Sequence, residues 1–400
     1  MSLQVTCTAP VNIAVLKYWG KKDETLITPI NSSFSVTLNQ ADLCTTTTVH
    51  LSTEFTADRI WLNGKEEDIN TTRLQNCLNA VRKTHGQVTL DDGTAVDGGA
   101  LGEYKVHIVS KNNFPTAAGL ASSASGYACL VATLARAYNV QESFPGQLTT
   151  FARMGSGSAC RSLAGGFVKW EMGGAAADAS DSLAVQKFDE AHWPDLAILV
   201  LVVNDGRKGT SSTSGMQTTV RTSKLLQRRI DTIADEHYAL LEKAVAERDF
   251  ATFGEVTMRD SNQFHALCLD TFPPIFYLND TSKSIIQLVH AYNAAKGGTR
   301  LAYTFDAGPN AVLFTQKADL DDVLRTVLHY YPPADGQPLA EYFPKADVLA
   351  QVGDFSTLAD DKVAQTFHGD RSAGQLKYIL HTTPGPGPQN LDTHLAPPQA

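Results

Sequence analysis

The sequence predicts a mixed α/β (α+β) fold in two domains, residues 1–190 and 191–400. Residues 104–110 alternate apolar and polar side chains, as a β-strand does, whereas apolar residues recur at helical spacing over 127–138. A chain of 400 residues suggests two domains, or one large one, and is long enough to bury a hydrophobic core. The chain turns small and polar over 172–195, and we therefore expect the domain boundary there.

Composition and charge exclude several classes of protein. The formal net charge of −9 argues against a general nucleic-acid-binding surface. The longest apolar run, 196–203, is too short to span a bilayer, and the first twenty residues lack the basic start and apolar core of a signal peptide. The 6 cysteines include no Cys-x-x-Cys pair, so neither a zinc site nor a disulfide framework is indicated. We expect a cytoplasmic protein with small-molecule ligands and no membrane or nucleic-acid partner.

The N-terminal half reads as strands followed by a helix. Alternation and Thr- and Val-rich composition predict strands at 4–18, 31–38, 45–51 and 167–171. Residues 61–64 have the composition of a hairpin tip. A helix is expected over 72–83, with Arg73 in its first turn, and a Gly- and Asp-rich loop over 91–102.

The C-terminal half alternates helices with short strands. Residues 196–203 predict a buried strand and 205–213 a polar loop. Helices are expected at 222–247, 249–268 and 281–296, the last one ended by two glycines. A strand at 301–305 leads into a tight turn, and 376–380 predicts a final strand before a Pro/Gly segment and a loose tail.

The segment 112–125 joins the strand at 104–110 to the helix that follows, with Ser122 and Ser123 near the first helical turn. Helix N-termini carry unpaired N–H groups and a partial positive charge, and they attract anions. Small side chains let a polyanion lie against the backbone. The segment is therefore either a phosphate-binding loop or an N-capped helix after a turn.

A second small-residue loop, 155–166, carries Arg161, which suits bidentate binding of a carboxylate or phosphate. The alternative is a structural arginine paired with an acid. Cys160 is the adjacent residue and could be a nucleophile. No histidine is near it in the sequence, however, and most cysteines are simply buried in the core.

Two further features have a functional and a structural reading. Lys17, Lys21 and Lys22 gather beside Tyr18 and Trp19, either as a binding site for a phosphorylated ligand or as a solvated surface. Asp306 follows the strand at 301–305, a position that suits either a residue that forms the turn or a general base.

Several familiar nucleotide and metal motifs do not occur. The sequence has no Gly-Lys-Ser or Gly-Lys-Thr, no Gly-x-Gly-x-x-Gly after a strand, no His-Glu-x-x-His and no EF-hand loop. The residues alone thus support an α/β enzyme that handles phosphorylated ligands.

Several motifs taken together resemble the diphosphomevalonate decarboxylases of the GHMP kinase superfamily. Residues 115–124 are similar to the superfamily's phosphate loop, a proline and a few small residues before Gly-Leu-Gly/Ala-Ser-Ser-Ala. The segments that resemble the decarboxylases, in chain order, are 9–21, 112–123, 155–161, 260–274 and 303–311.

The resemblance implies ATP-dependent decarboxylation of (R)-5-diphosphomevalonate to isopentenyl diphosphate, with release of ADP, phosphate and carbon dioxide, in the mevalonate pathway of isoprenoid and sterol biosynthesis. It also implies a GHMP kinase-like two-domain fold with the active site in the cleft between the domains, ATP as co-substrate, Mg²⁺ and a homodimer. The rival functions are a small-molecule kinase of the same superfamily and a nucleotide-sensing protein without turnover.

The resemblance also implies roles for individual residues. Asp306 would face the tertiary 3-hydroxyl, Arg161 would bind the carboxylate, and Lys17 would offset charge on the transferring phosphoryl group. Ser123 would lie near the γ-phosphate and Mg²⁺. The substrate would contact Tyr18, Trp19, Gly20, Lys21, Arg73, Ser156, Gly157, Ser158, Ala159, Cys160, Arg161, Ser212 (or Ser211) and Thr213. The ATP phosphates would contact Asn113, Pro115, Ala118, Gly119, Leu120, Ala121, Ser122 and Ser123.

Overall fold

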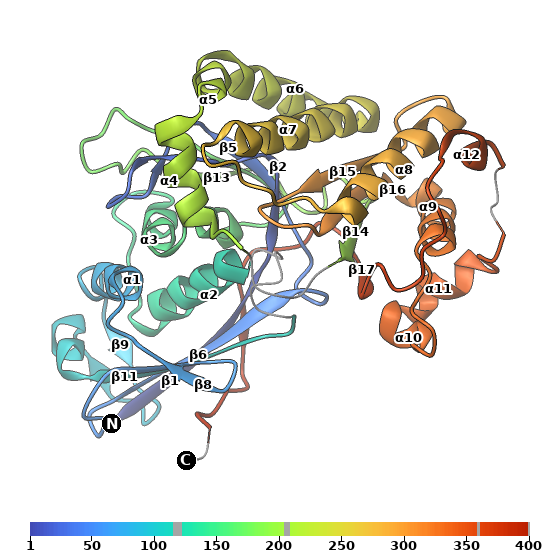
Figure 1. Ribbon diagram of the computed structural model, residues 1–400. Coiled ribbons are helices and arrows are strands. Elements are labelled where there is room, and N and C mark those ends of the chain that lie inside the picture. The colour runs from blue at the N-terminus through green and yellow to red at the C-terminus, as the bar shows by residue number, and fades with distance from the viewer. Residues whose placement is uncertain (115–121, 204–208, 358–360, 399–400) are drawn as a thin grey trace.

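A computed structural model of the chain describes residues 1–114, 122–203, 209–357 and 361–398. Its first layer is a 6-stranded sheet of order β18-β1-β6-β11-β7-β8, covered by helices α1, α2 and α3 (Figure 1). Only the β7–β11 pair in this sheet is parallel. The bounds are β1 Ser2–Pro10, β6 Cys44–Ser52, β7 Arg59–Leu62, β8 Lys65–Glu67, β11 Lys105–Asn112, β18 Gln389–Leu391, α1 Thr72–Arg82, α2 Ser122–Ala137 and α3 Gln147–Gly155.

Two further sheets share one large hydrophobic core. The sheet β13-β12-β5-β2 contributes residues such as Leu16 and Phe34 to the core that also holds the sheet β15-β16-β14-β17 and its helices. All seven residues of β14 are buried because β16 and β17 flank it on both edges and helices cover it. The bounds are β2 Asn12–Leu16, β5 Ser33–Thr37, β12 Phe167–Trp170, β13 Ala184–Phe188, β14 Leu196–Val202, β15 Leu301–Phe305, β16 Ala311–Gln316 and β17 Tyr378–Thr382.

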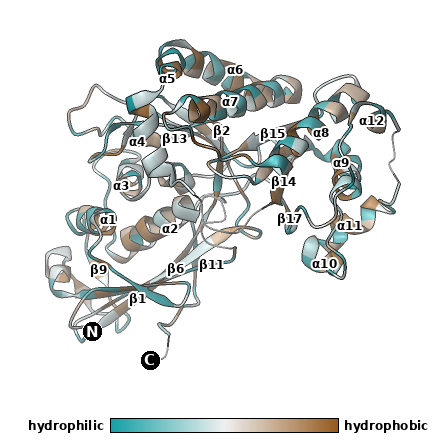
Figure 2. Cartoon of the chain, in the orientation of Figure 1, coloured by the Kyte–Doolittle hydropathy of each residue, from teal (hydrophilic) through white to brown (hydrophobic). Residues whose placement is uncertain are grey.

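The C-terminal half is rich in helices, and hydrophobic and hydrophilic stretches alternate along α7 (Figure 2), as expected where one face covers a sheet. Helix α8 begins with a capping box between Asn279 and Ser282 and ends at Gly297, whose φ of 69° suits glycine. The bounds are α4 Ser212–Thr222, α5 Leu225–Arg228, the π-helix η3 Arg229–Ile233, α6 Ala234–Glu247, α7 Phe250–Asp270, α8 Asp280–Lys296, α9 Lys317–Tyr330, α10 Leu339–Tyr342, α11 Ala346–Val352 and α12 Asp361–Thr366.

Short elements complete the description. The strand pairs are β3 Lys21–Asp23 with β4 Thr28–Pro29 and β9 Val88–Thr89 with β10 Ala95–Val96, and the 3₁₀ helices are η1 Gly98–Glu103 and η2 Gly157–Leu163. Within the ranges given above, no helix combines the length and apolar character needed to cross a bilayer.

The mixed α/β fold is confirmed, as are the predicted strand at 104–110 and the helix start at Ser122. Three expectations were wrong. Ser212 and Thr213 lie in the first turn of α4 rather than in a loop, because Ser211 caps that helix by accepting from the Ser214 N–H. The segment 91–102 contains β10 and most of η1. The strand at 376–380 is not the last one, since β18 follows it and pairs with β1. The domain division at residue 190 stays a prediction.

Candidate active site

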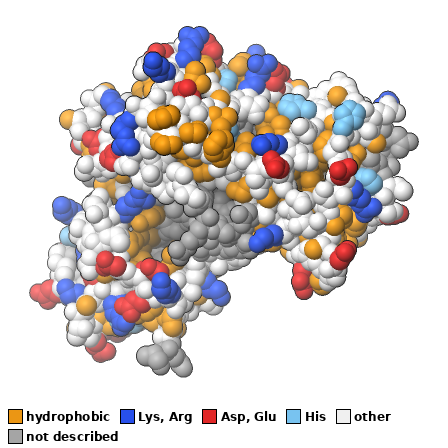
Figure 3. All heavy atoms as spheres, viewed as in Figure 1, with side chains coloured by type: hydrophobic (Ala, Val, Ile, Leu, Met, Phe, Trp, Pro, Cys, Tyr) orange, Lys and Arg blue, Asp and Glu red, His pale blue; other side chains and the backbone are white. Residues whose placement is uncertain are grey.

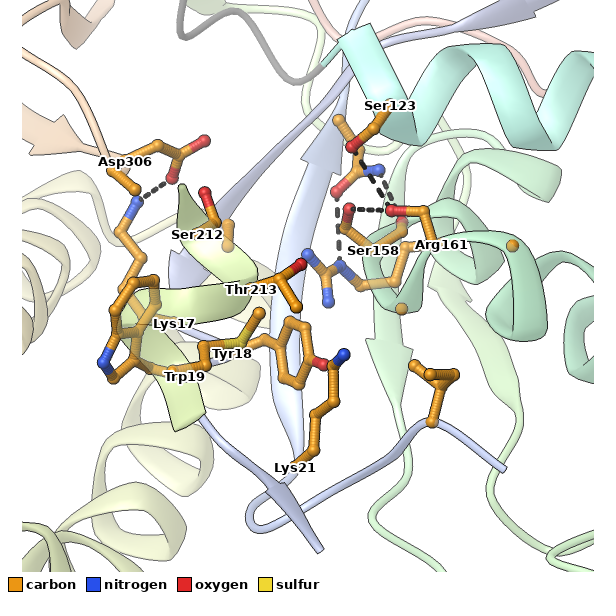
Figure 4. A pocket seen from close by; sticks show the side chains of 18 of the residues that line it. Lys17, Tyr18, Trp19, Lys21, Ser123, Ser158, Arg161, Ser212, Thr213 and Asp306 are labelled. Carbon is orange, nitrogen blue, oxygen red and sulfur yellow. Dashed lines mark hydrogen bonds and ion pairs between the residues drawn. The ribbon is translucent and has the colours of Figure 1, made fainter. Parts of the chain in front are cut away.

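One polar cavity collects side chains from both halves of the chain (Figure 4). Among the described residues, the charged side chains that line it are four cations and one carboxylate, in a protein whose net charge is −9. Such a cavity attracts anions against the overall charge of the molecule. The lining residues are Asn12, Ala14, Lys17, Tyr18, Trp19, Lys21, Ile27, Arg73, Ser123, Gly155, Ser156, Gly157, Ser158, Arg161, Ser212, Thr213, Met216, Phe264, Asp306 and Ala307.

Lys17 and Asp306 form an ion pair on one side of this cavity. Lys17 directly follows β2, and its Nζ donates to Asp306 Oδ1 at 2.7 Å. The lysine is 3% exposed and the aspartate 31%, so the carboxylate is the partner that a ligand can reach. The turn after β15 fixes Asp306 from behind, because its carbonyl accepts from the Gly308 N–H at 2.7 Å.

Arg161 lies across the cavity on η2 and is 2% exposed. Its Nε donates to Asn12 Oδ1 at 3.2 Å, and its Nη1 donates to Ser33 Oγ at 2.6 Å. Burial lowers the pKa of the guanidinium from its usual value, although arginine stays a cation in proteins. No hydrogen-bonded carboxylate neutralises it among the described residues, which removes the structural-pair alternative there.

A row of hydroxyl groups connects the start of α2 to the Arg161 loop. Ser123 Oγ lies 3.3 Å from Ser156 Oγ, which in turn lies 3.5 Å from Ser158 Oγ. Hydroxyls can donate or accept, and this row therefore suits ligand oxygens of either kind.

The two other cations that line the cavity, Lys21 and Arg73, are partly exposed. Arg73 Nη2 donates to Thr213 Oγ1 at 3.0 Å, which links α1 to α4. Burial and then the nearby Arg73 lower the pKa of Lys21, and together they outweigh the opposite effect of the Glu24 carboxylate. The Tyr18 hydroxyl is buried without a hydrogen-bond partner among the described residues, and burial raises its pKa.

The cavity includes thirteen of the residues predicted for catalysis or binding: Lys17, Tyr18, Trp19, Lys21, Arg73, Ser123, Ser156, Gly157, Ser158, Arg161, Ser212, Thr213 and Asp306. It includes Ser212 but not Ser211, whose hydroxyl is engaged as the helix cap. Pro115, Ala118, Gly119, Leu120 and Ala121 lie outside the described residues.

Other predicted residues lie near the cavity without lining it. Gly20, Ala159 and Cys160 are packed behind its wall, and Ser122 opens α2. Burial raises the pKa of the Cys160 thiol to about 12, which argues against a nucleophile. The Asn113 side chain binds the backbone of Cys44 and lines a separate cavity with Lys111 and Phe114.

Sequence reasoning gave no role to Asn12. Its Nδ2 donates to the Ser158 carbonyl at 3.0 Å and to Ser162 Oγ at 2.7 Å, while its Oδ1 orients Arg161. The available signal was an asparagine at the start of an otherwise apolar strand. Met216 and Phe264 also line the cavity, and their apolar side chains carried no such signal.

Acidic metal clusters are not part of this cavity. In the portion of the chain that is described, no group of three or more His, Cys, Asp or Glu side chains could hold a metal ion. A divalent cation here would take its ligands chiefly from bound phosphates and water.

Comparison with known proteins gives a consistent result over nearly the whole chain. Residues 9–184 match the "Diphosphomevalonate decarboxylase-like N-terminal domain" and residues 198–391 the "Mevalonate 5-diphosphate decarboxylase C-terminal domain". The diphosphomevalonate decarboxylase of Rattus norvegicus is 54% identical over 391 residues, covering 98% of this chain and 94% of the relative.

Solved structures agree with the sequence matches. Mevalonate diphosphate decarboxylase from Trypanosoma brucei superposes with a TM-score of 0.86 and 39% identity, covering 97% of this chain and 98% of that one. A structure described as MDDEF in complex with MVAPP, AMPPCP and magnesium has a TM-score of 0.73 and 31% identity, covering 98% and 100%.

Proposed function

The chain belongs to the diphosphomevalonate decarboxylase family, and on that premise we propose that it converts (R)-5-diphosphomevalonate to isopentenyl diphosphate, with consumption of ATP and release of ADP, phosphate and carbon dioxide. The observation that carries the proposal is the Lys17–Asp306 ion pair facing Arg161 across one cationic cavity. The reaction serves the mevalonate pathway of isoprenoid and sterol biosynthesis.

Asp306 acts on the 3-hydroxyl of the substrate. A tertiary alcohol is a poor leaving group, and phosphorylation converts it into a good one. The partly exposed Asp306 carboxylate orients or deprotonates this hydroxyl, and it later faces the positive charge that develops at C3 as phosphate departs. The Lys17 ammonium, 2.7 Å from the carboxylate, offsets negative charge on the transferring phosphoryl group.

Arg161 binds the carboxylate that becomes carbon dioxide. Asn12 and Ser33 engage its Nε and Nη1, and we assign Nη2 to the substrate. The electrons of the breaking C–C bond then form the new double bond as the phosphate leaves. Catalysis in such a site is mainly positioning and electrostatics.

The diphosphate lies at the opposite end, where cations and hydroxyls are dense. Tyr18 suits this role because its buried hydroxyl lacks a protein partner among the described residues. The residues assigned to the substrate there are Tyr18, Lys21, Arg73, Ser156, Ser158, Ser212 and Thr213, all of which line the cavity.

ATP approaches from the start of helix α2, with Ser123 beside its γ-phosphate. Mg²⁺, when bound, neutralises charge on the phosphates and orients the transferring group. Ser123 is the described residue that we assign to the cation, because its hydroxyl oxygen lines the cavity beside the helix N-terminus that suits the phosphates, which would carry the Mg²⁺ with them. An ATP analogue and magnesium accompany MVAPP in the MDDEF complex.

Carbon dioxide release from carboxyl-labelled diphosphomevalonate, with ATP and Mg²⁺, tests the proposal. We expect release that requires ATP, and we expect Asp306→Asn to lower turnover by on the order of 10²–10⁴ while ligand binding is kept. ADP formed without carbon dioxide would instead identify a small-molecule kinase. Binding of both ligands with no product would identify a nucleotide sensor.

We further propose a homodimer. Phe272 and Phe276 are 77% and 74% exposed, and Leu269, Leu225 and Val220 are between 42% and 55% exposed. These residues come from two segments, 220–225 and 269–276, which are joined by hydrogen bonds. Figure 3 shows hydrophobic side chains gathered over the ends of α4 and α7. Exposed apolar patches mark interaction surfaces. Sedimentation at micromolar concentration should give the mass of two chains, and a single-chain mass would remove the proposal.

We place the enzyme in the cytoplasm. All six cysteines are unpaired and five of them are buried, as is usual in a reducing compartment. Fluorescence imaging of the tagged full chain in its own cells checks this assignment.

A further inference from the structure

Lys17 is held from behind by side chains of the C-terminal half. Strand β2 ends at Leu16, and its register with β5 shifts between Ala14 and Leu16, so that Lys17 leaves the ladder. Its N–H donates to Asp260 Oδ1 at 2.7 Å, and its carbonyl accepts from Arg229 Nη2 at 3.0 Å. Buried backbone groups need such partners, and here charged side chains supply them.

Asp260 and Arg229 form a buried ion pair. Both side chains are 0% exposed, and the guanidinium donates to the two carboxylate oxygens at 2.8 and 3.1 Å. Burial raises the pKa of Asp260, but Arg229 and a hydrogen bond with His237 outweigh it and bring the pKa to about 2, so the carboxyl is ionised. Each charge is thereby opposed by the other, and Arg229 Nη1 also donates to Gln263 Oε1, whereas Arg229 Nε has no hydrogen-bond partner among the described residues.

The local backbone is unusual where Arg229 stands. A π-helical turn, η3, interrupts the path from α5 to α6 and begins with Arg229. π-Helical turns are rare in proteins, and many of those that occur lie at functional sites. Replacing a buried ion pair by apolar residues often leaves stability unchanged or higher, so stability alone is a weak reason for this pair.

The side chain and the main chain of Lys17 therefore contact different carboxylates. Its ammonium binds Asp306, while its peptide groups bind the Asp260–Arg229 pair. We propose that Asp260 and Arg229 are positioning residues that fix the main chain of Lys17 and so aim its ammonium at Asp306. The expected effect on turnover rests on the proposed function, whereas the expected effect on the position of the Lys17 ammonium does not.

Arg229→Lys is the central variant, because it keeps the charge and removes the fork that reaches both Asp260 and the Lys17 carbonyl. The matched control is Arg82→Lys, since Arg82 forms a similar two-bond pair with Asp58 at 2.9 and 3.0 Å, away from the cavity. We expect Arg229→Lys to lower kcat on the order of 10- to 100-fold with KM for diphosphomevalonate within about twofold, as misplacement of a catalytic group does. Arg82→Lys should leave both constants unchanged.

A double-mutant cycle separates positioning from general damage to the fold. In a Lys17→Ala background, Arg229→Lys should cause no further loss of kcat, because no ammonium remains to be aimed. An equal fold-loss in both backgrounds would overturn the proposal. If Arg229→Lys does not fold, Asn31→Ala takes its place, since Asn31 Nδ2 donates to the same Lys17 carbonyl at 3.2 Å outside the ion pair.

A crystal structure of each variant provides a readout independent of turnover. We expect the distance from Lys17 Nζ to Asp306 to lengthen beyond hydrogen-bonding reach in Arg229→Lys, or less strongly in Asn31→Ala, and to stay at the wild-type value in Arg82→Lys. An unchanged distance would overturn the positioning role. If the wild-type protein released no carbon dioxide, the proposed function would fail. The distance would still test whether Asp260 and Arg229 fix the main chain of Lys17.

Discussion

Acidification should destabilise the fold through His265 on helix α7. Its ring is 7% exposed, packs against the rings of Phe264, Tyr277 and Phe305, and has no hydrogen-bond partner for Nε2 among the described residues. Burial, and then the charge of nearby Lys17, lower its pKa from 6.5 to about 3. The folded protein therefore holds His265 neutral at pH values where the unfolded chain protonates it.

The sign and size of the effect follow from proton linkage. The stability that depends on neutral His265 is complete above pH 6.5 and is lost as the pH falls from 6.5 toward 3, because only the unfolded state binds the proton there. Each pH unit in that interval lowers the free energy of unfolding by about 1.4 kcal/mol, which amounts to about 2 kcal/mol at pH 5.

Urea unfolding at pH 7.5 and pH 5 measures this loss. In His265→Gln the difference between the two pH values should shrink by about 2 kcal/mol relative to wild type, whatever the substitution costs at pH 7.5. His368→Gln is the matched control, because His368 is exposed and its replacement disturbs no buried site. A pH difference that is the same in His265→Gln and wild type would refute the reasoning.

Two further predictions concern the cavity wall. Gly157→Ala should lower kcat/KM for diphosphomevalonate about 10-fold, because the new Cβ would lie 2.8 Å from the Trp170 ring and 2.9 Å from the Tyr18 ring and would displace them. Gly126→Ala, where nothing lies within 4 Å, is the control for steady-state kinetics, and equal effects of the two would contradict this account. Arg161→Gln should reduce carbon dioxide release on the order of 10²-fold through loss of the charged donor, and unchanged release in the labelled assay would remove Arg161 from carboxylate binding.

Elements with strong local signals could be predicted from the sequence. The strand over 104–110, the helix at 72–83 and the hairpin at 61–64 each follow from periodicity or from turn residues that accept positive φ, as Asn63 and Gly64 do. Helix α4 was missed because its Ser- and Thr-rich sequence buries only Gly215, Met216 and Thr219, which leaves no apolar stripe to detect.

Long-range pairing was beyond the reach of local patterns. Strand β18 is a strand because its backbone adds to the edge of β1, where Thr6 pairs with Leu391. Its three residues are exposed and carry no alternation. Asp260 fell within a motif of the resemblance, yet its contact with the Lys17 backbone could not be inferred from either neighbourhood in the sequence.

The candidate site is also built by contacts between residues far apart in the sequence. Lys17 directly follows strand β2 of the N-terminal half, but its peptide N–H is held by a residue 243 positions away and its ammonium by one 289 positions away. The contacts of β2 with helices α6 and α7, within the core that β14 shares, are what bring those partners to it. Because the ion pair at Asp306 depends on packing between the two halves, loosening that packing should reduce turnover before it unfolds the chain. Kinetic constants, not unfolding curves alone, are therefore the sensitive measure of substitutions between β2 and α7.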